Sequence, residues 1–206
     1  MNARVTVLDL GLGNLGSVVQ ALVRAGGEAR LSADAREIGR APRVVLPGVA
    51  AFGLGMERAE AIGLRGALDE VVRRGAPLLG VCLGMQILFD EGEEDGLRRG
   101  LGLFPGRVTR LPSGVQVPHI GWQRLECTGA SPLLAQSSSP WAYFANAYRC
   151  EAPAEITQAV ADHSGVRIAS VVGRGTVHGV QFHPEKSARD GELLLARFLG
   201  LREGSS

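Results

Sequence analysis

The chain has 206 residues, of which 45% are hydrophobic, and its charges nearly cancel at +1. A chain of this length can bury a substantial core, and its balanced charge argues against nucleic acid or an anionic membrane as a partner. Its longest weakly polar stretch, Gly75 to Phe89, is shorter than the roughly 20 residues that cross a bilayer. Composition therefore predicts a single globular domain over residues 1–206, without nucleic-acid or membrane partners.

The chain has three cysteines, an odd number without paired spacing. This usage fits a reducing compartment and predicts a cytoplasmic protein. Cys127 and Cys150 are most simply interpreted as packing residues.

The first half of the sequence alternates predicted strands with predicted helices. The strands are short apolar runs, and the helices have apolar residues at helical spacing. Strands are expected at 4–10, 29–31, 44–46 and 77–79, and helices at 15–25 and 57–74. Continuous apolar strands between helices are typical of a parallel sheet covered on both faces, so this half predicts an α/β fold.

A glycine-rich loop, Gly11-Leu12-Gly13-Asn14-Leu15-Gly16, follows the first strand and opens the first helix. With Asp34 roughly 20 residues further on, it has the form of a dinucleotide-binding fingerprint. The same glycines also suit a tight strand-to-helix turn capped by Asn14. One hypothesis is therefore an oxidoreductase that binds a nicotinamide or flavin cofactor at this loop.

The loop after the third strand reads Leu46-Pro47-Gly48-Val49. Glycine there frees a backbone N–H of Gly48 or Val49 to point into a site beside the N–H of Leu83. Two such donors form an oxyanion hole for a tetrahedral intermediate. The alternative is that Pro47-Gly48 is simply a turn.

Cys82 lies in Gly80-Val81-Cys82-Leu83-Gly84, between the apolar run 77–79 and a helix expected at 85–89. This is the arrangement of a nucleophile elbow with sulfur in place of oxygen. The glycines permit a sharp, strained turn, and the N-terminal end of the following helix favours a thiolate. The pattern predicts that Cys82 is a nucleophile.

From about Gly106 the pattern changes to short alternating segments, which predict mixed or antiparallel strands before a closing helix. The strands are expected at 107–111, 115–122, 141–148, 156–160, 166–172 and 176–183, and the helix at 192–199.

The last of these strands ends in His183-Pro184-Glu185-Lys186. Proline biases His183 towards extended geometry, in which side chains two apart share a face. Glu185 can then accept a hydrogen bond from one imidazole nitrogen while the other faces the thiol, which predicts a Cys82–His183–Glu185 triad. Lys186 is the only lysine among 22 basic residues, a hint of a site where guanidinium cannot replace ammonium.

These motifs together resemble a known family. Gly-Val-Cys-Leu-Gly-Met-Gln around Cys82 and the later Phe-His-Pro-Glu resemble the class I (triad) glutamine amidotransferases. Within them, Asp9–Leu15, Pro118–Trp122 and His183–Ser187 are similar to the glutaminase subunits of imidazole glycerol phosphate synthase. The resemblance implies a flavodoxin-like α/β fold, with a largely parallel central sheet, flanking helices and a mixed or antiparallel C-terminal part.

The resemblance also implies a reaction, hydrolysis of L-glutamine to glutamate and ammonia, with neither cofactor nor metal. Ammonia would pass to a (βα)8-barrel cyclase subunit, which forms imidazole glycerol phosphate and aminoimidazole carboxamide ribotide. Glutamine-binding roles are implied for Gln86, Glu94, Ala147 and Tyr148. Roles at the partner interface, in a heterodimer, are implied for Asn14, Trp122, Tyr143 and Lys186.

One segment departs from the family pattern. The family usually has His and then Ser or Thr before Tyr, where this chain has Asn146-Ala147-Tyr148. Hydrogen bonds from the lost side chains are in doubt, whereas backbone contacts with glutamine can survive.

Other functions stay open. A narrower alternative is the glutaminase subunit of another class I amidotransferase, of the anthranilate or pyridoxal phosphate synthase type. A non-catalytic partner module would bind a synthase without turnover, and the intact triad argues against it. For Trp122 and Tyr143, the sequence is equally compatible with a plain core role.

Overall fold

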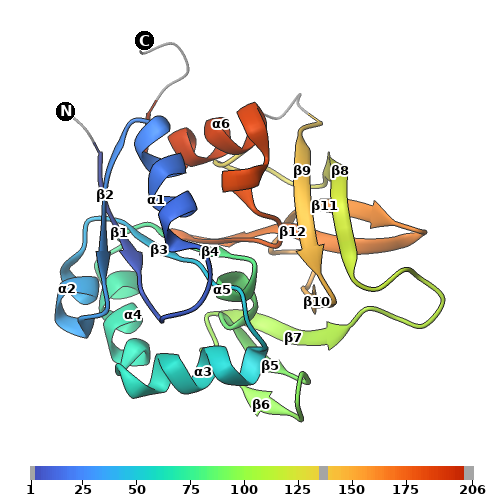
Figure 1. Ribbon diagram of the computed structural model, residues 1–206, viewed down its shortest axis with the longest axis horizontal. Helices are drawn as coiled ribbons and strands as arrows, with labels where there is room; N and C mark the ends of the chain where they lie inside the picture. Colours follow the sequence, from blue (N-terminus) through green and yellow to red (C-terminus); the bar gives the residue numbers. More distant parts are fainter. Residues whose placement is uncertain (1–2, 135–138, 202–206) are drawn as a thin grey trace.

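The computed structural model describes residues 3–134 and 139–201. Within these ranges the chain forms a nine-stranded central sheet, a smaller four-stranded sheet and six α-helices (Figure 1). The strands of the central sheet are β1 (Ala3–Leu8), β2 (Gly27–Ser32), β3 (Val44–Leu46), β4 (Leu78–Val81), β8 (His119–Cys127), β9 (Trp141–Asn146), β11 (Thr157–His163), β12 (Val166–Arg174) and β13 (Val177–Val180).

The second sheet consists of β5 (Phe89–Gly92), β6 (Arg98–Arg99), β7 (Phe104–Arg110) and β10 (Tyr148–Glu151). The helices are α1 (Leu15–Arg24), α2 (Ala35–Arg40), α3 (Phe52–Ala61), α4 (Leu64–Arg73), α5 (Leu83–Gln86) and α6 (Ala188–Phe198), with a 3-10 turn η1 (Pro184–Lys186).

The central sheet changes character along its width. Its order is β2-β1-β3-β4-β13-β12-β11-β8-β9. The strands from β2 to β13 pair in parallel, whereas those from β13 through β12, β11 and β8 to β9 pair antiparallel. This confirms the expected α/β fold, with a parallel first half and an antiparallel C-terminal part.

Helices cover both faces of the parallel half. On one face, α1 and α6 pack on alternate strand residues such as Val7 and Val45. On the other, α2, α3 and α4 pack on Leu8, Val44 and Leu46. Because side chains alternate across a strand and both faces are covered, the inner strands β3 and β4 are apolar throughout, whereas the edge strand β2 carries Glu28 and Arg30. This double burial explains the continuous apolar runs in the sequence.

Two helices differ from the sequence-based expectation. The single helix expected at 57–74 is α3 followed by α4, because Gly63 adopts a left-handed φ of 67° between them. The helix expected at 85–89 ends at Gln86, and Phe89 instead starts β5, where it pairs with Phe104. Strand pairing at long range overrides helical spacing here.

Two of the expected strands also have different limits. The strand expected at 141–148 is divided at Ala147 between β9 in the central sheet and β10 in the second sheet. The strand expected at 115–122 begins only at His119. Helix α2 was not expected from the pattern, because its six residues are too few to show a helical period.

Candidate active site

The pairing of β4 with β13 places Cys82 and His183, the predicted nucleophile and base, together. The two strands run parallel, with Val81 opposite Val180. The backbone N–H of Cys82 donates to the Val180 carbonyl at 2.8 Å, so the segments that follow β4 and β13 leave the sheet at the same carboxyl edge. Ligands and catalytic groups collect at this edge of α/β sheets. Cys82 and His183, far apart in sequence, therefore meet here.

Cys82 occupies the strained turn that the motif predicts. Its φ of 54° and ψ of −113° are unusual for a residue with a side chain. A Cβ on Gly84 would overlap the Leu46 carbonyl oxygen, and one on Gly80 would lie 2.6 Å from the Gly84 carbonyl oxygen. Both glycines are needed for this close backbone packing, which confirms the elbow geometry.

His183 and Glu185 form the hydrogen-bonded pair that their spacing predicts. His183 Nδ1 lies 2.8 Å from Glu185 Oε1, and the two side chains are only 4% and 7% exposed. The backbone of His183 is also held, because its N–H donates to the Tyr143 carbonyl at 2.9 Å and its carbonyl accepts from Ser187 Oγ at 2.7 Å. The imidazole therefore has one orientation.

The charge state of His183 follows from its neighbours. Burial lowers the pKa of His183, but hydrogen bonds with Cys82 and Glu185, together with the charges of both groups, outweigh it and raise the pKa to about 10. The imidazole is therefore protonated at neutral pH. Helix α5, after Cys82, is a single turn with little dipole, so the imidazolium is the main cationic partner for a thiolate.

The loop at Gly48 and Val49 packs directly against the elbow. A Cβ on Gly48 would lie 3.1 Å from the nearest side-chain atom of Leu83, so the space between the two backbones is filled. Val49 is 58% exposed, and its backbone N lies 3.2 Å from the Cβ position of Gly13. The two backbone segments that were expected to supply oxyanion donors are thus adjacent.

A buried network of side-chain amides extends from Cys82. Gln86 Nε2 donates to the Gln181 Oε1 at 3.1 Å and to the Tyr148 carbonyl at 3.3 Å. Gln181 Nε2 lies 3.9 Å from Cys82 Sγ, and Cys150 Sγ lies 4.0 Å from Gln181 Oε1. Gln181 is not among the residues predicted from the sequence, which also assigned Cys150 to packing only. The available signal was a polar residue inside an apolar strand, between Val180 and Phe182.

Glu94 and Ala147 are held by backbone hydrogen bonds. Glu94 Oε2 accepts from the Phe52 N–H at 2.8 Å, at the start of α3. Burial is the main cause that raises the pKa of Glu94, with the Phe52 N–H opposing it. The Ala147 carbonyl accepts from the Leu111 N–H at 3.0 Å, at the point where the chain passes from β9 to β10. Glu94 is therefore a partly buried capping group and not a solvated loop residue.

The segment that departs from the family pattern is satisfied only in part. Asn146 Nδ2 donates to the Tyr148 carbonyl at 3.0 Å, whereas Asn146 Oδ1 is buried without a partner. The Tyr148 carbonyl thus accepts hydrogen bonds from the side-chain amides of both Asn146 and Gln86. Asn146 stands where the family pattern described above has a histidine, and its side chain holds this carbonyl by a hydrogen bond.

Three of the residues expected at a partner interface form a row, the Trp122–Tyr143–Lys186 row. The rings of Trp122 and Tyr143 meet edge to face at 5.9 Å, and Lys186 Nζ lies 5.8 Å from the centre of the Tyr143 ring. Trp122 is 46% exposed, so the alternative interpretation of Trp122 as a core residue is wrong. Asn14 caps α1 by accepting from the Ser17 N–H at 3.2 Å.

The glycine-rich loop does not form a dinucleotide site. The cavity that it lines, with His183, Glu185 and Lys186 on the other side, has a volume of about 30 Å³. That is space for about one water molecule. Asp34 accepts hydrogen bonds from the Arg36 and Glu37 N–H groups and caps α2. The oxidoreductase hypothesis is therefore wrong, and the loop serves the strand-to-helix turn.

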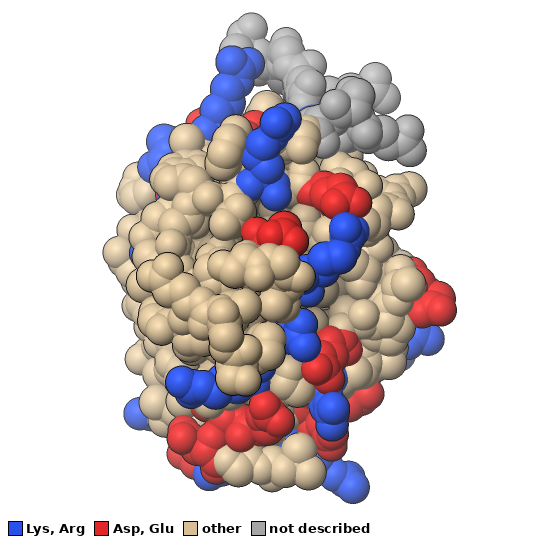
Figure 2. Space-filling model, turned by 90° about the vertical axis from the view of Figure 1, so that its right-hand side faces the viewer, with Lys and Arg blue, Asp and Glu red and all other residues tan. Residues whose placement is uncertain are grey.

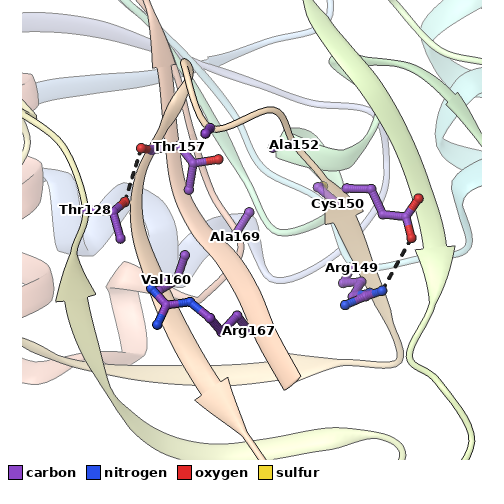
Figure 3. A pocket seen from close by; sticks show the side chains of 10 residues that line it. Thr128, Arg149, Cys150, Ala152, Thr157, Val160, Arg167 and Ala169 are labelled. Atoms are coloured by element: carbon purple, nitrogen blue, oxygen red, sulfur yellow. Dashed lines mark hydrogen bonds and ion pairs between the residues drawn. The ribbon is translucent and has the colours of Figure 1, made fainter. Parts of the chain in front are cut away.

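A larger cavity of about 380 Å³ lies between β10 and the strands β11 and β12. Figure 3 shows Arg149 and Cys150 on one side, with Val160, Arg167 and Ala169 on the other. Each arginine already pairs with a glutamate, Arg149 with Glu151 at 3.3 Å and Arg167 with Glu126 at 3.0 Å. Cys150 borders this cavity and also contacts Gln181.

Charged side chains of both signs are found on the surface of the molecule (Figure 2). Figure 2 shows basic and acidic side chains interspersed, with wide uncharged areas between them, on one face of the molecule. Among the residues that the structure describes, no helix is long and apolar enough to span a bilayer. The same residues contain no group of three or more His, Cys, Asp or Glu side chains suited to a metal ion.

Comparisons with known proteins agree with this geometry. The sequence model of the family described as glutamine amidotransferase class-I matches residues 6–200. The chain is 47% identical over 197 residues to the imidazole glycerol phosphate synthase subunit HisH of Symbiobacterium thermophilum, covering 95% of this chain and 93% of that protein. It is 43% identical to the protein of the same name from Streptococcus sanguinis, covering 93% of each chain.

Solved structures share the fold at lower identity. PurLQS from Thermotoga maritima superposes with a TM-score of 0.76 at 21% identity, covering 97% of this chain and 99% of that chain. The glutaminase domain of CTPS from Trypanosoma brucei gives a TM-score of 0.65 at 15% identity, covering 96% of this chain and 91% of that chain. At such identities the likeness concerns the fold alone.

Proposed function

The chain belongs to the class I glutamine amidotransferase family, and we propose that it is the glutaminase subunit of an imidazole glycerol phosphate synthase. It hydrolyses L-glutamine to glutamate and ammonia and delivers the ammonia to a cyclase subunit. The observation that carries the proposal is near-full-length identity of 47% to a HisH protein, together with the triad at the sheet edge.

The first half of the reaction forms a thioester. The Cys82 thiolate attacks the side-chain amide carbon of glutamine, and the carbonyl oxygen becomes an oxyanion. The N–H of Leu83 and one from Gly48 or Val49 stabilise that oxyanion, which supports catalysis because the charge develops in the transition state. The His183 imidazolium gives its proton to the amide nitrogen, and the C–N bond breaks so that this nitrogen leaves as ammonia.

The second half releases glutamate. His183, now neutral, takes a proton from water, whose oxygen attacks the thioester carbon. The C–S bond breaks, and the products are glutamate, a Cys82 thiolate and a His183 imidazolium, so the site returns to its starting state. Glu185 orients the ring throughout, through the 2.8 Å contact at Nδ1, and stabilises the imidazolium.

Glutamine binding is assigned to the segments around the amide network. We assign contacts with glutamine to Gln86, whose backbone N–H donates to the Cys82 carbonyl at 3.1 Å, and to the backbone of Ala147 and Tyr148, and we assign the substrate ammonium to the Glu94 carboxylate. The Gln86 contact with the Tyr148 carbonyl supports this arrangement, because it joins the elbow helix to β10. A substrate held between these elements lies beside Cys82.

The Trp122–Tyr143–Lys186 row, with Asn14, is assigned to the interface with a (βα)8-barrel cyclase subunit. Exposed aromatic rings beside a cation are typical of binding hot spots. The row also borders the triad, because the Tyr143 carbonyl accepts from the His183 N–H. Ammonia released at Cys82 therefore leaves next to the partner, and a cytoplasmic heterodimer of the two subunits is the working assembly.

The test is glutamate release from L-glutamine by the purified chain, alone and with a cyclase subunit that carries its ribonucleotide ligand. We expect turnover that rises with the liganded cyclase and is absent in Cys82→Ala. The alternative, an anthranilate or pyridoxal phosphate synthase type, predicts stimulation by one of those synthase subunits instead. Failure to bind the cyclase overturns the proposed partner, and turnover that survives in Cys82→Ala overturns the proposed nucleophile.

A further inference from the structure

Gln181 is a fully buried polar residue for which the triad mechanism gives no role. It follows β13 directly and is 0% exposed. Its backbone N–H donates to the Ser170 carbonyl at 3.0 Å, which ties it to β12. Because Val180 pairs with Val81, Gln181 and Cys82 are the next residues at the same sheet edge. The position of Gln181 beside the nucleophile is thus set by backbone pairing.

Hydrogen bonding decides which way the Gln181 amide faces. The Tyr148 carbonyl can only accept, so Gln86 must present its NH₂ group to it. The same NH₂ lies 3.1 Å from Gln181 Oε1, which must therefore be the carbonyl end. The NH₂ end of Gln181 then faces Cys82 Sγ at 3.9 Å. A flipped amide would set two donors against each other and lose both contacts.

Cys150 supports the same orientation from β10. Its Sγ lies 4.0 Å from Gln181 Oε1. Burial raises the pKa of Cys150 well above its ordinary value, and the charge of Cys82 adds to this, so the group stays a thiol and can donate. Two donors, from Gln86 and Cys150, thus converge on the Gln181 carbonyl and polarise the amide towards the Cys82 sulfur.

We propose that Gln181 is a catalytic residue whose side-chain amide donates a hydrogen bond from Nε2 to the Cys82 thiolate, with Gln86 and Cys150 as the positioning residues that hold the amide. The His183 imidazolium loses its proton when ammonia leaves, whereas the neutral amide keeps its N–H at every step. Gln181 therefore supports the sulfur when it leaves the thioester as a thiolate.

This inference rests on the proposed function only in taking Cys82 as the nucleophile. It is tested without glutamine, by the pH dependence of Cys82 alkylation by iodoacetamide in the isolated chain, quantified site by site by peptide mass spectrometry. The titratable groups that face Cys82 are His183 and Cys150, with Glu185 behind His183. Cys127 in the same sample is the internal reference.

The variants are Gln181→Met, which keeps the length without a donor, and Gln181→Glu, which is isosteric and places an acceptor against the sulfur. We expect alkylation of Cys82 at neutral pH to fall about tenfold in Gln181→Met and further in Gln181→Glu, with Cys127 unchanged. Cys150→Ala should give a smaller change in the same direction. Thermal unfolding of each variant shows whether it is folded.

Glutamate release with the liganded cyclase provides the second readout. We expect kcat to fall and KM to stay nearly constant, with the acidic limb of the kcat/KM profile moved to higher pH in both Gln181 variants. If both folded variants keep the wild-type pH profiles and differ only in melting temperature, Gln181 is a packing residue and the inference is wrong. Absent turnover in the wild type would instead count against the proposed function, and the alkylation result would still decide on Gln181.

Discussion

The two halves of the central sheet differ in strand direction and in the kind of surface that they provide. The parallel half, from β2 to β13, packs apolar residues on both of its faces and leads into the elbow at Cys82, the loop at Gly48 and the segment that reaches His183. The antiparallel half, from β12 to β9, carries exposed aromatic residues such as Trp122 and Trp141. Chemistry requires fixed backbone geometry, which double burial provides, whereas docking requires exposed apolar surface.

Two buried histidines show the same contrast in their charge. His183, where the parallel half ends, has polar partners that raise its pKa to about 10. His119, on β8, is stacked between Phe144 and His163, and both of its ring nitrogens lack a partner. Burial, and then the charge of His163, lowers the pKa of His119 to about 4. Partners, and not burial alone, decide whether a buried histidine is charged.

The largest effect is expected at the elbow, from Gly84→Ala. The added methyl would overlap the Leu46 carbonyl oxygen, so strand and turn must separate. We expect a loss of at least about 3 kcal/mol in the free energy of unfolding, measured by urea denaturation. Gly66→Ala in α4 is the matched control, because nothing lies within 4 Å of its Cβ position, and it should stabilise by about 0.5 kcal/mol. Equal effects of the two variants would contradict the tight packing of the elbow.

Glu185→Gln should reduce kcat for glutamine by about 10²-fold, because the ring loses its anionic partner. The pKa of His183 should fall from about 10. Because the pKa is raised from 6.5 to about 10, the stability that the charged His183 contributes is fully present below pH 6.5 and is lost as pH rises through 10. In the variant this loss should occur at lower pH.

An NMR titration of the His183 ring measures the change in its pKa. Melting temperatures between pH 6 and 10 measure the change in the pH at which stability is lost. The exposed Glu155→Gln is the control and should change neither. An unchanged titration in Glu185→Gln would assign the raised pKa to Cys82 alone.

Trp122→Ala tests the antiparallel half as a docking surface. Removing a half-exposed ring from the Trp122–Tyr143–Lys186 row should weaken binding of the cyclase subunit by about 2 kcal/mol, measured by calorimetry. Glutamine hydrolysis by the isolated chain should change little. Leu97→Ala is the control, since Leu97 is 72% exposed on the turn between β5 and β6. If Leu97→Ala weakens binding as much as Trp122→Ala, the partner docks elsewhere.

The smallest effect is expected from His119→Phe. With its pKa lowered to about 4, His119 stays neutral in the folded chain while the unfolded chain protonates near 6.5. Stability is therefore lost as pH falls from 6.5 to 4, and the phenylalanine variant should avoid about 1 to 2 kcal/mol of that loss. Urea denaturation at pH 7 and at pH 4.5 measures the difference. A loss as steep as in the wild type would show that other groups control acid stability.

Local patterns in the sequence were sufficient for the chemistry. The glycines around Cys82 and the His183-Pro184-Glu185 spacing predicted the elbow and the His183–Glu185 pair, because both depend on backbone turns within a few residues. The meeting of Cys82 with His183 depends on the pairing of β4 with β13. The apolar runs predicted the parallel half for the same reason, since double burial leaves its mark on every position of a strand.

The tertiary structure decided what depends on pairing between distant segments. In the sequence, Gln181 is only a polar residue within an apolar segment. The register of β13 against β4 places it beside Cys82 in the structure. Phe89 joins β5 and not a helix because Phe104 pairs with it. Trp122 is large and apolar like a core residue, and only the tertiary structure shows that its side of β8 leaves it 46% exposed. Strand register is a long-range property, and local residue patterns do not encode it.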